Sequence, residues 1–333
     1  MSARGILAAS LLVSIGLWGA GPALAGPEDE LKKAREEIQN KNYAAAIEIL
    51  RPLAEKEGMH QAQYHLGLMY EDGEGVPKDD KIAAQWYQRA ADGGGKHAAY
   101  NLALLYAKGH GVPQSNEKAF ALFEKAAEQG LADAQYNAGL MALSGAGTRK
   151  DFATAAKWFE KAAAQGNDDA RYNLALLYLD GQGVEKSEKK ALELLQPLAA
   201  KGLPDAEFNL GVMYLAGEGV PRDARQALDL FKKAADKGYP EAAYNVGMMY
   251  MNGEGVARSP EQAVTWITRA AEKGYPPAQY NLGMMYERGT GVTRNHRTAT
   301  SWLQKAAAQG DKEAIARVGA PPKQTAERKK GKG

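Results

Sequence analysis

The sequence predicts an all-α solenoid, built from a helix pair that recurs every 36 residues. Three kinds of residue keep this interval: an aromatic residue, an alanine and a glycine. The aromatic positions are Tyr64, Tyr100, Tyr136, Tyr172, Phe208, Tyr244 and Tyr280. The alanines are Ala62, Ala98, Ala134, Ala170, Ala206, Ala242, Ala278 and Ala314, and the glycines are Gly58, Gly94, Gly130, Gly166, Gly202, Gly238, Gly274 and Gly310. A unit of this size cannot bury its own apolar face, so successive units must stack on one another.

Residues 1–25 have the pattern of a secretory signal peptide. Arg4 lies in a short basic start, residues 6–18 form an apolar stretch too short to span a bilayer comfortably, and residues 23–25 read Ala-Leu-Ala, a small-x-small cleavage site. We therefore expect cleavage after Ala25 and a periplasmic or secreted product without stable membrane insertion. An uncleaved anchor is the alternative. A bacterial lipoprotein anchor is excluded, because the chain has no cysteine.

Residues 26–59 are predicted to form an N-terminal capping helix pair. A charged helix over residues 28–39 precedes a helix with an apolar face over residues 43–56. Terminal repeats of a solenoid are atypical because one of their sides faces water. At the other end, residues 311–320 are predicted to form a C-terminal capping helix, and the Lys-, Pro- and Gly-rich residues 321–333 are predicted to be a basic disordered tail.

Between these caps we place a seven-unit array at residues 60–310, with two helices in each unit. Residues 240–252 illustrate the first helix, which has apolar residues at helical spacing on a wide face. It ends at Gly253 and Gly255, of which the first suits a left-handed C-cap and the second allows a turn where a Cβ would clash. The second helix carries an alanine, a large residue three positions later and an Ala-Ala step. The large residues, which we expect in the core rather than as ligand platforms, are Trp86, Leu122, Trp158, Leu194, Leu230, Trp266 and Trp302.

Together these motifs resemble the Sel1-like repeat, a relative of the tetratricopeptide repeat. The shared pattern is Ala-x-Tyr-Asn-Leu-Gly-x-x-Tyr, then Gly-x-Gly-Val, an alanine, a tryptophan, Ala-Ala and Gly, over roughly residues 61–316. The resemblance implies a right-handed α-solenoid whose first helices line the concave face and which acts as a protein-binding scaffold or regulator. The chain is identified as an exported bacterial member without cysteines, so the disulfides of the family's cysteine-rich secreted branch do not apply.

Composition and motifs argue against several function classes. The formal net charge is only +2 and the repeat body is nearly balanced, so nucleic-acid binding is not expected. No motif supplies a nucleophile with its base, and we therefore expect no catalytic residues, no cofactor and no enzyme activity. Of the five histidines, His60 and His97 begin neighbouring helices, but two histidines without a third ligand do not predict a metal site.

Two further columns have structural interpretations. The regularity of one set of asparagines predicts hydrogen bonds between units: Asn101, Asn137, Asn173, Asn209, Asn245 and Asn281. The aromatic residues from Tyr64 to Tyr280 either point toward the groove or pack against the preceding helix.

The differences between units locate a candidate partner site in units three to six. Their first helices end with an apolar residue at one equivalent position, Leu143, Leu179, Leu215 and Met251. Other units have Glu71, Ala107 and Glu287 there. Nearer the start, the same four helices carry Asp133, Asp169, Asp205 and Glu241. An apolar stripe with an acidic rim suits an amphipathic partner segment that bears Lys or Arg. The alternative is that the stripe packs within the superhelix and the acids favour the helix dipole.

We therefore predict an exported protein-binding scaffold, adaptor or regulator of the bacterial cell envelope, which binds a protein or peptide on its concave face. A glycan- or peptidoglycan-binding module that uses the aromatic residues as stacking platforms is the alternative. The sequence does not define the oligomeric state.

Overall fold

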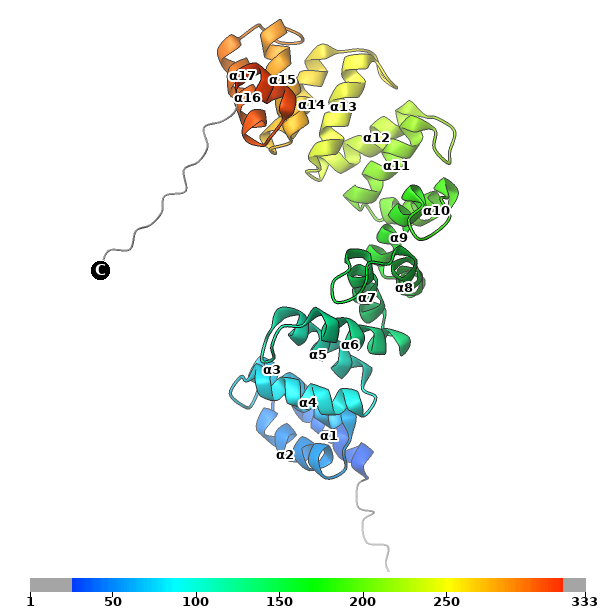
Figure 1. Cartoon of the computed structure of the whole chain (residues 1–333), viewed down its shortest axis with the longest axis vertical. Coiled ribbons are helices and arrows are strands. Elements are labelled where there is room, and N and C mark those ends of the chain that lie inside the picture. Colours follow the sequence, from blue (N-terminus) through cyan, green and yellow to red (C-terminus); the bar gives the residue numbers. More distant parts are fainter. Residues whose placement is uncertain (1–25, 320–333) are drawn as a thin grey trace, which may run out of the picture. The chain divides into compact units, whose positions relative to one another are not determined.

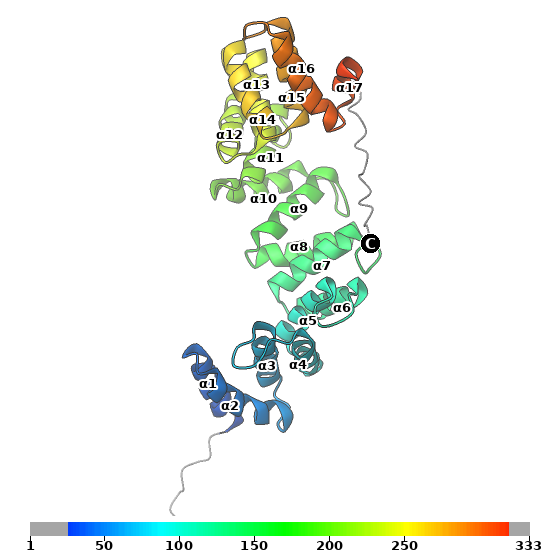
Figure 2. The same ribbon diagram turned by 90° about the vertical axis from the view of Figure 1, so that its left-hand side faces the viewer.

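The structure is a computed structural model that describes residues 26–319. Every regular element within these residues is a helix, from α1 to α17 (Figures 1 and 2). The described residues fall into two compact units, divided in the sequence between Gln114 and Ser115. The predicted signal peptide and the predicted basic tail lie outside the described residues.

Unit 1 contains the N-terminal helix pair and the next three helices. Its elements are α1 (Pro27–Gln39), α2 (Tyr43–Glu55), α3 (His60–Asp72), α4 (Asp80–Asp92) and α5 (Lys96–Lys108). One hydrophobic core joins α1, α2 and α3 through residues such as Leu31, Leu50 and Leu66, and the partly buried Trp86 of α4 packs against it.

Unit 2 contains the remaining helices. They are α6 (Asn116–Glu128), α7 (Ala132–Ser144), α8 (Phe152–Ala164), α9 (Asp168–Asp180), α10 (Glu188–Ala200), α11 (Pro204–Ala216), α12 (Ala224–Asp236), α13 (Pro240–Asn252), α14 (Pro260–Glu272), α15 (Pro276–Arg288), α16 (His296–Ala308) and α17 (Lys312–Val318). We number the repeats 1 to 7 by their first helices, which are α3, α5, α7, α9, α11, α13 and α15. Within unit 2, each helix packs against the next along the chain (Figure 1). The predicted all-α solenoid of helix pairs is thus confirmed.

Glycines end the first helices, and polar side chains begin the second ones. Each first helix ends at a glycine in the left-handed conformation: Gly73, Gly109, Gly145, Gly181, Gly217, Gly253 and Gly289. Each second helix begins after a residue whose side chain accepts a backbone N–H of the first turn: Asp79, Ser115, Asp151, Ser187, Asp223, Ser259 and Asn295. These caps satisfy backbone groups that a helix leaves unpaired at its ends. The C-caps predicted from the Gly-x-Gly pairs are confirmed.

The second glycine of a pair lets the loop of one repeat lie against the preceding repeat. A Cβ on Gly147 would lie 2.1 Å from the backbone oxygen of Asn116, at the start of α6, and the φ angle of Gly147 is +72°. Only glycine tolerates both the close approach and this conformation without strain.

Small residues also bring the two helices of a repeat together. Ala134 on α7 is fully buried, and a Cβ on Gly139 would lie 2.6 Å from the ring of Phe159 on α8. Trp158 is 4% exposed, as predicted for the core. The tryptophans at the equivalent position of other repeats, Trp86, Trp266 and Trp302, are half-buried.

A cation from the same helix lies over each of these indole rings. The pairs are Arg89 over Trp86, Lys161 over Trp158, Arg269 over Trp266 and Lys305 over Trp302, at 3.8 to 5.0 Å from the ring centroid. Such cation–π contacts take up one face of each ring. The tryptophans are therefore engaged within the scaffold.

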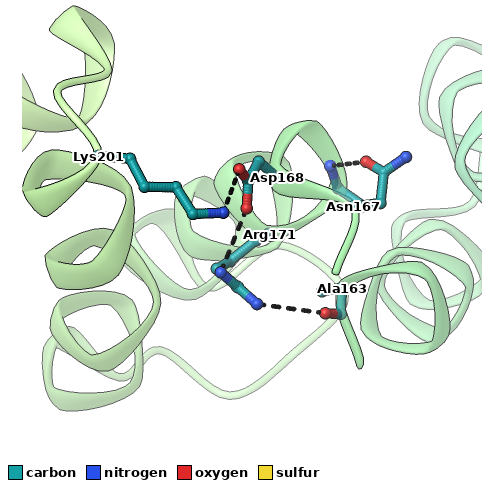
Figure 3. A network of polar contacts seen from close by, with 6 residues as sticks. Ala163, Asn167, Asp168, Arg171 and Lys201 are labelled. Atoms are coloured by element: carbon teal, nitrogen blue, oxygen red, sulfur yellow. Dashed lines mark hydrogen bonds and ion pairs between the residues drawn. The ribbon is translucent and has the colours of Figure 1, made fainter. Parts of the chain in front are cut away.

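Polar side chains join the end of one repeat to the start of the next (Figure 3). Arg171 on α9 donates a hydrogen bond to the backbone oxygen of Ala163, at the end of α8. The same guanidinium pairs with Asp168, which also pairs with Lys201 after α10. This network satisfies one of the carbonyl groups that the preceding helix leaves unpaired.

Glutamines provide the equivalent junction in repeats 3 and 7. Gln135 donates to the oxygen of Ala127 at the end of α6, and its own side-chain oxygen accepts from Gln165 at 2.7 Å. Gln279 and Gln309 repeat this arrangement. In repeat 5 the pair is ionic, since the buried Glu207 lies 2.6 Å from the Lys237 ammonium.

Candidate functional site

The candidate site lies on four first helices of unit 2, α7, α9, α11 and α13. We call Asp133, Asp169, Asp205 and Glu241 the acidic column, and Leu143, Leu179, Leu215 and Met251 the apolar column. In each helix the two columns are ten positions apart, which corresponds to about 15 Å along the axis. The structure therefore places each acid near the start, and each apolar residue near the end, of the same helix.

The acidic column is open to solvent and lacks cationic partners. Asp133, Asp169 and Asp205 are exposed and Glu241 is half-buried. Among the ion pairs of the described residues, none involves these four side chains. Each acid lies in the first turn of its helix, where the dipole favours a negative charge. The dipole explains why an acid is tolerated there, but it does not supply a cationic side chain.

Tyrosines beside the acidic column respond to this negative charge. Burial and the nearby Asp169 raise the pKa of Tyr136, and burial and Asp205 raise the pKa of Tyr172. Tyr239 hydrogen-bonds to Asp205, and burial together with this carboxylate raises the pKa of Tyr239. A negative field that disfavours tyrosinate favours a bound cation at the same place.

Asparagines cross-link the first helices of successive repeats, as the sequence predicted. The Asn209 amide donates to the Tyr172 hydroxyl at 3.0 Å, and the Asn281 amide donates to the Tyr244 hydroxyl at 2.7 Å. Asn209 also donates to the backbone oxygen of Asp205, one turn earlier. These bonds hold the tyrosine hydroxyls in place next to the acidic column.

The aromatic column packs against the second helix of its own repeat. Tyr136 lies 6.0 Å from Phe159 and Phe208 lies 5.6 Å from Phe231, measured between ring centroids. The sequence left open whether these rings point toward the groove or pack against the preceding helix. The structure shows half-buried rings that contact an aromatic ring on the second helix of the same repeat.

The apolar column contributes to the scaffold as well as to the surface. All four residues are half-buried and pack against the hydrophobic core of unit 2: Leu143, Leu179, Leu215 and Met251. The glutamates at this position in other repeats have their own partners. Glu71 accepts a hydrogen bond from the buried Tyr87, and Glu287 pairs with Arg317. Packing therefore accounts for part of the pattern that the sequence analysis assigned to a ligand.

A third column, which the sequence analysis missed, lies between the other two. It consists of Leu140, Leu176, Val212 and Met248, seven positions after each acid. Residues seven apart lie on the same face two turns along a helix. Val212 is 38% exposed, more than any other large hydrophobic residue in the described part of the chain. The spacing of seven residues from each acid is the feature of the sequence that could have identified these positions. We call this third column the middle column.

Methionines enlarge the apolar surface at the α13 end of the site. Met248, Met251 and Met284 line a cavity of 170 Å³ between α13 and α15, with Asn281 at its edge. Methionine side chains are flexible and polarizable, so they adapt to ligands of different shape. This part of the surface can accommodate an apolar side chain.

Unit 1 contains a larger cavity of a different character. It has a volume of 760 Å³ and is lined by Tyr70, Gln85, Trp86, Gln88 and Pro113, among others. Arg89, whose guanidinium lies over the Trp86 ring, also lines this cavity. Mixed aromatic and amide linings of this kind are compatible with a sugar.

The histidines do not assemble a metal centre. His97 lies 6.1 Å from the Tyr64 ring, and the neighbouring His65 accepts a hydrogen bond from Arg35 at 3.2 Å. Residues 26–319 contain no group of three or more side chains that is suited to hold a metal ion. No helix of this part of the chain is long and apolar enough to cross a membrane.

A stack of helix pairs that presents a long first-helix surface defines a helical-repeat protein. The Sel1 repeat pattern matches seven consecutive segments, residues 60–95, 96–131, 132–167, 168–203, 204–239, 240–275 and 276–311. The chain therefore belongs to the Sel1 repeat family, whose members commonly serve as protein-interaction scaffolds.

Two solved structures are similar over most of the chain. The Sel1 repeat protein from Oxalobacter formigenes is 35% identical, with a TM-score of 0.68 over 88% of this chain and 85% of that one. A protective antigen of uropathogenic Escherichia coli with an SLR fold is 33% identical, with a TM-score of 0.74 over 88% of this chain. The match spans 64% of the antigen's length. Among curated proteins, no similar sequence was found.

Proposed function

We propose that this chain is a protein-binding scaffold of the bacterial cell envelope. Its partner site is the face formed by the acidic, middle and apolar columns on α7, α9, α11 and α13. The partner contributes an amphipathic segment, whose apolar side chains lie on the middle column and whose Lys or Arg side chains pair with the acids. Family membership supports the general role, and the geometry of this face supports the choice of surface.

The observation that carries the proposal is the repetition of one unpaired charge beside one apolar surface in four consecutive repeats. Scaffold contacts account for the aromatic and asparagine columns, and in part for the apolar column. They leave the acidic column without ion pairs within residues 26–319, and they leave Val212 exposed. Burial of apolar area would supply affinity, while the carboxylates would orient the segment.

The proposed location rests on residues 1–25, whose sequence has the features of a secretory signal. N-terminal sequencing of the protein from an envelope fraction tests it, and the expected first residue is Gly26. A chain that still begins at Met1 in the cytosol would refute the proposed export.

A pair of charge-reversal variants tests the partner site. The probe is a synthetic amphipathic helix with Leu on one side and Lys on the other, compared with the same peptide carrying Glu in place of Lys. We expect only the Lys peptide to bind, and Asp169→Lys with Asp205→Lys to weaken it by about tenfold or more, because two favourable pairs become repulsive. Glu193→Lys with Asp229→Lys, which changes the same charge on exposed second-helix positions, is the control. Equal affinity of both double variants would refute the site.

Apolar contact is tested separately. Val212→Glu places a carboxylate in the middle column at an exposed position, so the fold should tolerate it, whereas binding of the Lys peptide should fall if its apolar side lies there. In-cell photo-crosslinking from position 212 then identifies the natural partner by mass spectrometry.

The cavity of unit 1 favours a second candidate function, the binding of a glycan or of peptidoglycan. Soluble peptidoglycan fragments in a thermal-shift assay test it. A rise in melting temperature that Trp86→Leu abolishes would support this function, whereas no shift at millimolar fragment would exclude it.

A further inference from the structure

The acidic column differs from the carboxylates at the repeat junctions of unit 2 in having no cationic partner. Carboxylates at the repeat junctions are paired: Asp168 with Lys201, Glu207 with Lys237, and Asp236 with Arg269. The scaffold therefore has the means to neutralise acids, but within residues 115–319 it brings no Lys or Arg to the acidic column. A cation for this column has to come from elsewhere.

The chain itself contains a segment of complementary charge. Residues 320–333 lie outside the described structure, and their sequence carries Lys323, Arg328, Lys329, Lys330 and Lys332 against the single acid Glu327. Pro321, Pro322 and Ala326 add small apolar groups. The methylene stems of Lys and Arg also cover apolar surface while their charged ends reach a carboxylate.

The segment is attached close enough to reach the site. It follows α17, which packs on α16 at the same end of unit 2 as α15 and α13. Residues 320–332 span at most about 45 Å when extended. Equivalent helices of successive repeats are about 10 Å apart. The helix α13, two repeats before α17, is therefore about 20 Å from it, and α11, three repeats before, is about 30 Å from it. A tethered segment also has an effective concentration in the millimolar range, so a weak contact is populated.

We propose that residues 323–332 bind in cis to the acidic column at Glu241 and Asp205, lie over Met248 and Val212, and compete with the partner segment. This inference rests on the surface assigned under the proposed function and adds its regulation. The contact is electrostatic and exposed, so it is weak and sensitive to salt. A partner with more apolar side chains displaces it, and the free scaffold keeps its apolar face covered.

The absence of cysteine makes a direct distance measurement possible. Spin labels on Gly331→Cys and on Asn252→Cys, an exposed residue at the end of α13, report the distance between the tail and the site in the full chain. We expect a short, narrow distance distribution at about 50 mM salt and a broad one at about 500 mM, where screening reduces the attraction. Asp205→Lys with Glu241→Lys should broaden it at low salt, whereas Glu193→Lys with Asp229→Lys should not.

Two outcomes of this measurement would overturn the proposal. One is a broad distribution that neither salt nor charge reversal changes. The other is a short distance that disappears when labelled protein is diluted with an excess of unlabelled protein, because the tail would then be bound to a second copy.

Competition separates this inference from the proposed function. Neutralisation of the tail by Lys or Arg→Gln at positions 323, 328, 329, 330 and 332 should increase the affinity for the Lys peptide several-fold, since a tethered competitor is removed. Lys189→Gln with Lys233→Gln on exposed second-helix positions is the control. Equal affinity of wild type and tail variant would overturn the tail contact and leave the partner site intact. A salt-sensitive short distance in a protein that does not bind the peptide would retain the tail contact and refute the partner site.

Discussion

The first helices of the two units use the same positions in opposite ways. In repeat 1, which lies in unit 1, the Asn position is occupied by His65 and the apolar position by Glu71, and these side chains are engaged by Arg35 and Tyr87 respectively. In unit 2, Asn209 and Asn281 bond to tyrosines of the preceding repeat, and the acids of the acidic column have no cationic partner within the described residues. One scaffold thus supports two kinds of surface. Where these polar groups are paired internally, the first helix makes scaffold contacts. Where the acids have no cationic partner, the first helix carries the proposed partner site.

The largest difference between the units is expected for two tryptophans at one equivalent position. Trp158 in unit 2 is 4% exposed, whereas Trp86 in unit 1 is half-buried. Trp158→Ala should lower the free energy of unfolding by about 3–5 kcal/mol, and Trp86→Ala by roughly half of that, because less area is taken from water. Urea titration with comparison of m-values measures both. A loss below about 1 kcal/mol for Trp158→Ala would mean that the column is available to ligands.

The second prediction concerns the replacement of the Glu71 and Tyr87 pair of repeat 1 by the apolar pair that repeat 3 has at the same positions. Tyr87 is fully buried, donates to Glu71 at 2.5 Å and accepts from Asn101. Tyr87→Phe should cost about 1.5–3 kcal/mol, because it leaves a carboxylate and an amide without their partner. The double variant Tyr87→Phe with Glu71→Leu imports the Phe159 and Leu143 combination of repeat 3, and it should recover most of the loss.

A double-mutant cycle in urea supplies the test of this exchange. Simple addition of the two single losses would show that Glu71 and Tyr87 act independently, contrary to the structure. In that case the identity of Glu71 would not depend on Tyr87, and the difference between the units would need another explanation.

The third prediction concerns the free energy of unfolding at acidic pH. In unit 1 it should depend on His65, which occupies the position where the other repeats carry asparagine. Burial, together with the positive charge of Arg35, lowers the pKa of His65 to about 4. An unfolded histidine titrates near ~6.5. As the pH falls from about 6.5 to 4, the unfolded chain binds a proton that the folded chain does not, so the folded state loses stability in this window. Above it, both forms are neutral and no loss occurs.

His65→Asn removes this titration and installs the residue that repeats 2 to 7 carry. Near pH 4.5 the variant should retain about 1–2 kcal/mol more of its neutral-pH stability than wild type, a range that allows for solvent screening at a half-buried site. His110→Asn, at an exposed loop position, is the control. Parallel pH profiles for wild type and His65→Asn would refute the assignment.

The sequence predicted what repeats along the chain and missed what joins different columns. A residue type that recurs at one position of the repeat predicted three features correctly. These are the left-handed glycines such as Gly253, the bonds between repeats made by Asn209 and Asn281, and the burial of Trp158. The link between Glu71 and Tyr87 could not be predicted in this way, because its two ends lie on different helices of the repeat and only one repeat has both. The exposure of Val212 was missed for a related reason: its column is apolar throughout, so period alone cannot separate a surface position from a core position.

The smallest effect is expected at the first repeat junction, where unit 1 lacks a side chain that unit 2 has. Gln63 donates to the oxygen of Ala54, but its buried Oε1 has no hydrogen-bond partner within the described residues. The position that holds Gln165 in repeat 3 is Gly93 in repeat 1. Gly93 has φ −76° and ψ 6°, close to the −90° and 4° of Gln165, so its backbone suits any residue.

Gly93→Gln should therefore stabilise the protein by about 1 kcal/mol, through a less flexible unfolded chain and a new amide bond to Gln63. A Cβ at this position would lie 3.1 Å from His60 Cβ, so that side chain has to shift by a few tenths of an ångström. Gly93→Ala separates the contributions, because it shares the backbone effect and the crowding but supplies no donor. In thermal unfolding, the melting temperature of Gly93→Gln should be higher than that of Gly93→Ala. A ranking of Ala equal to or above Gln would show that the unpaired oxygen of Gln63 is already satisfied by water, and that the junctions of the two units are equivalent after all.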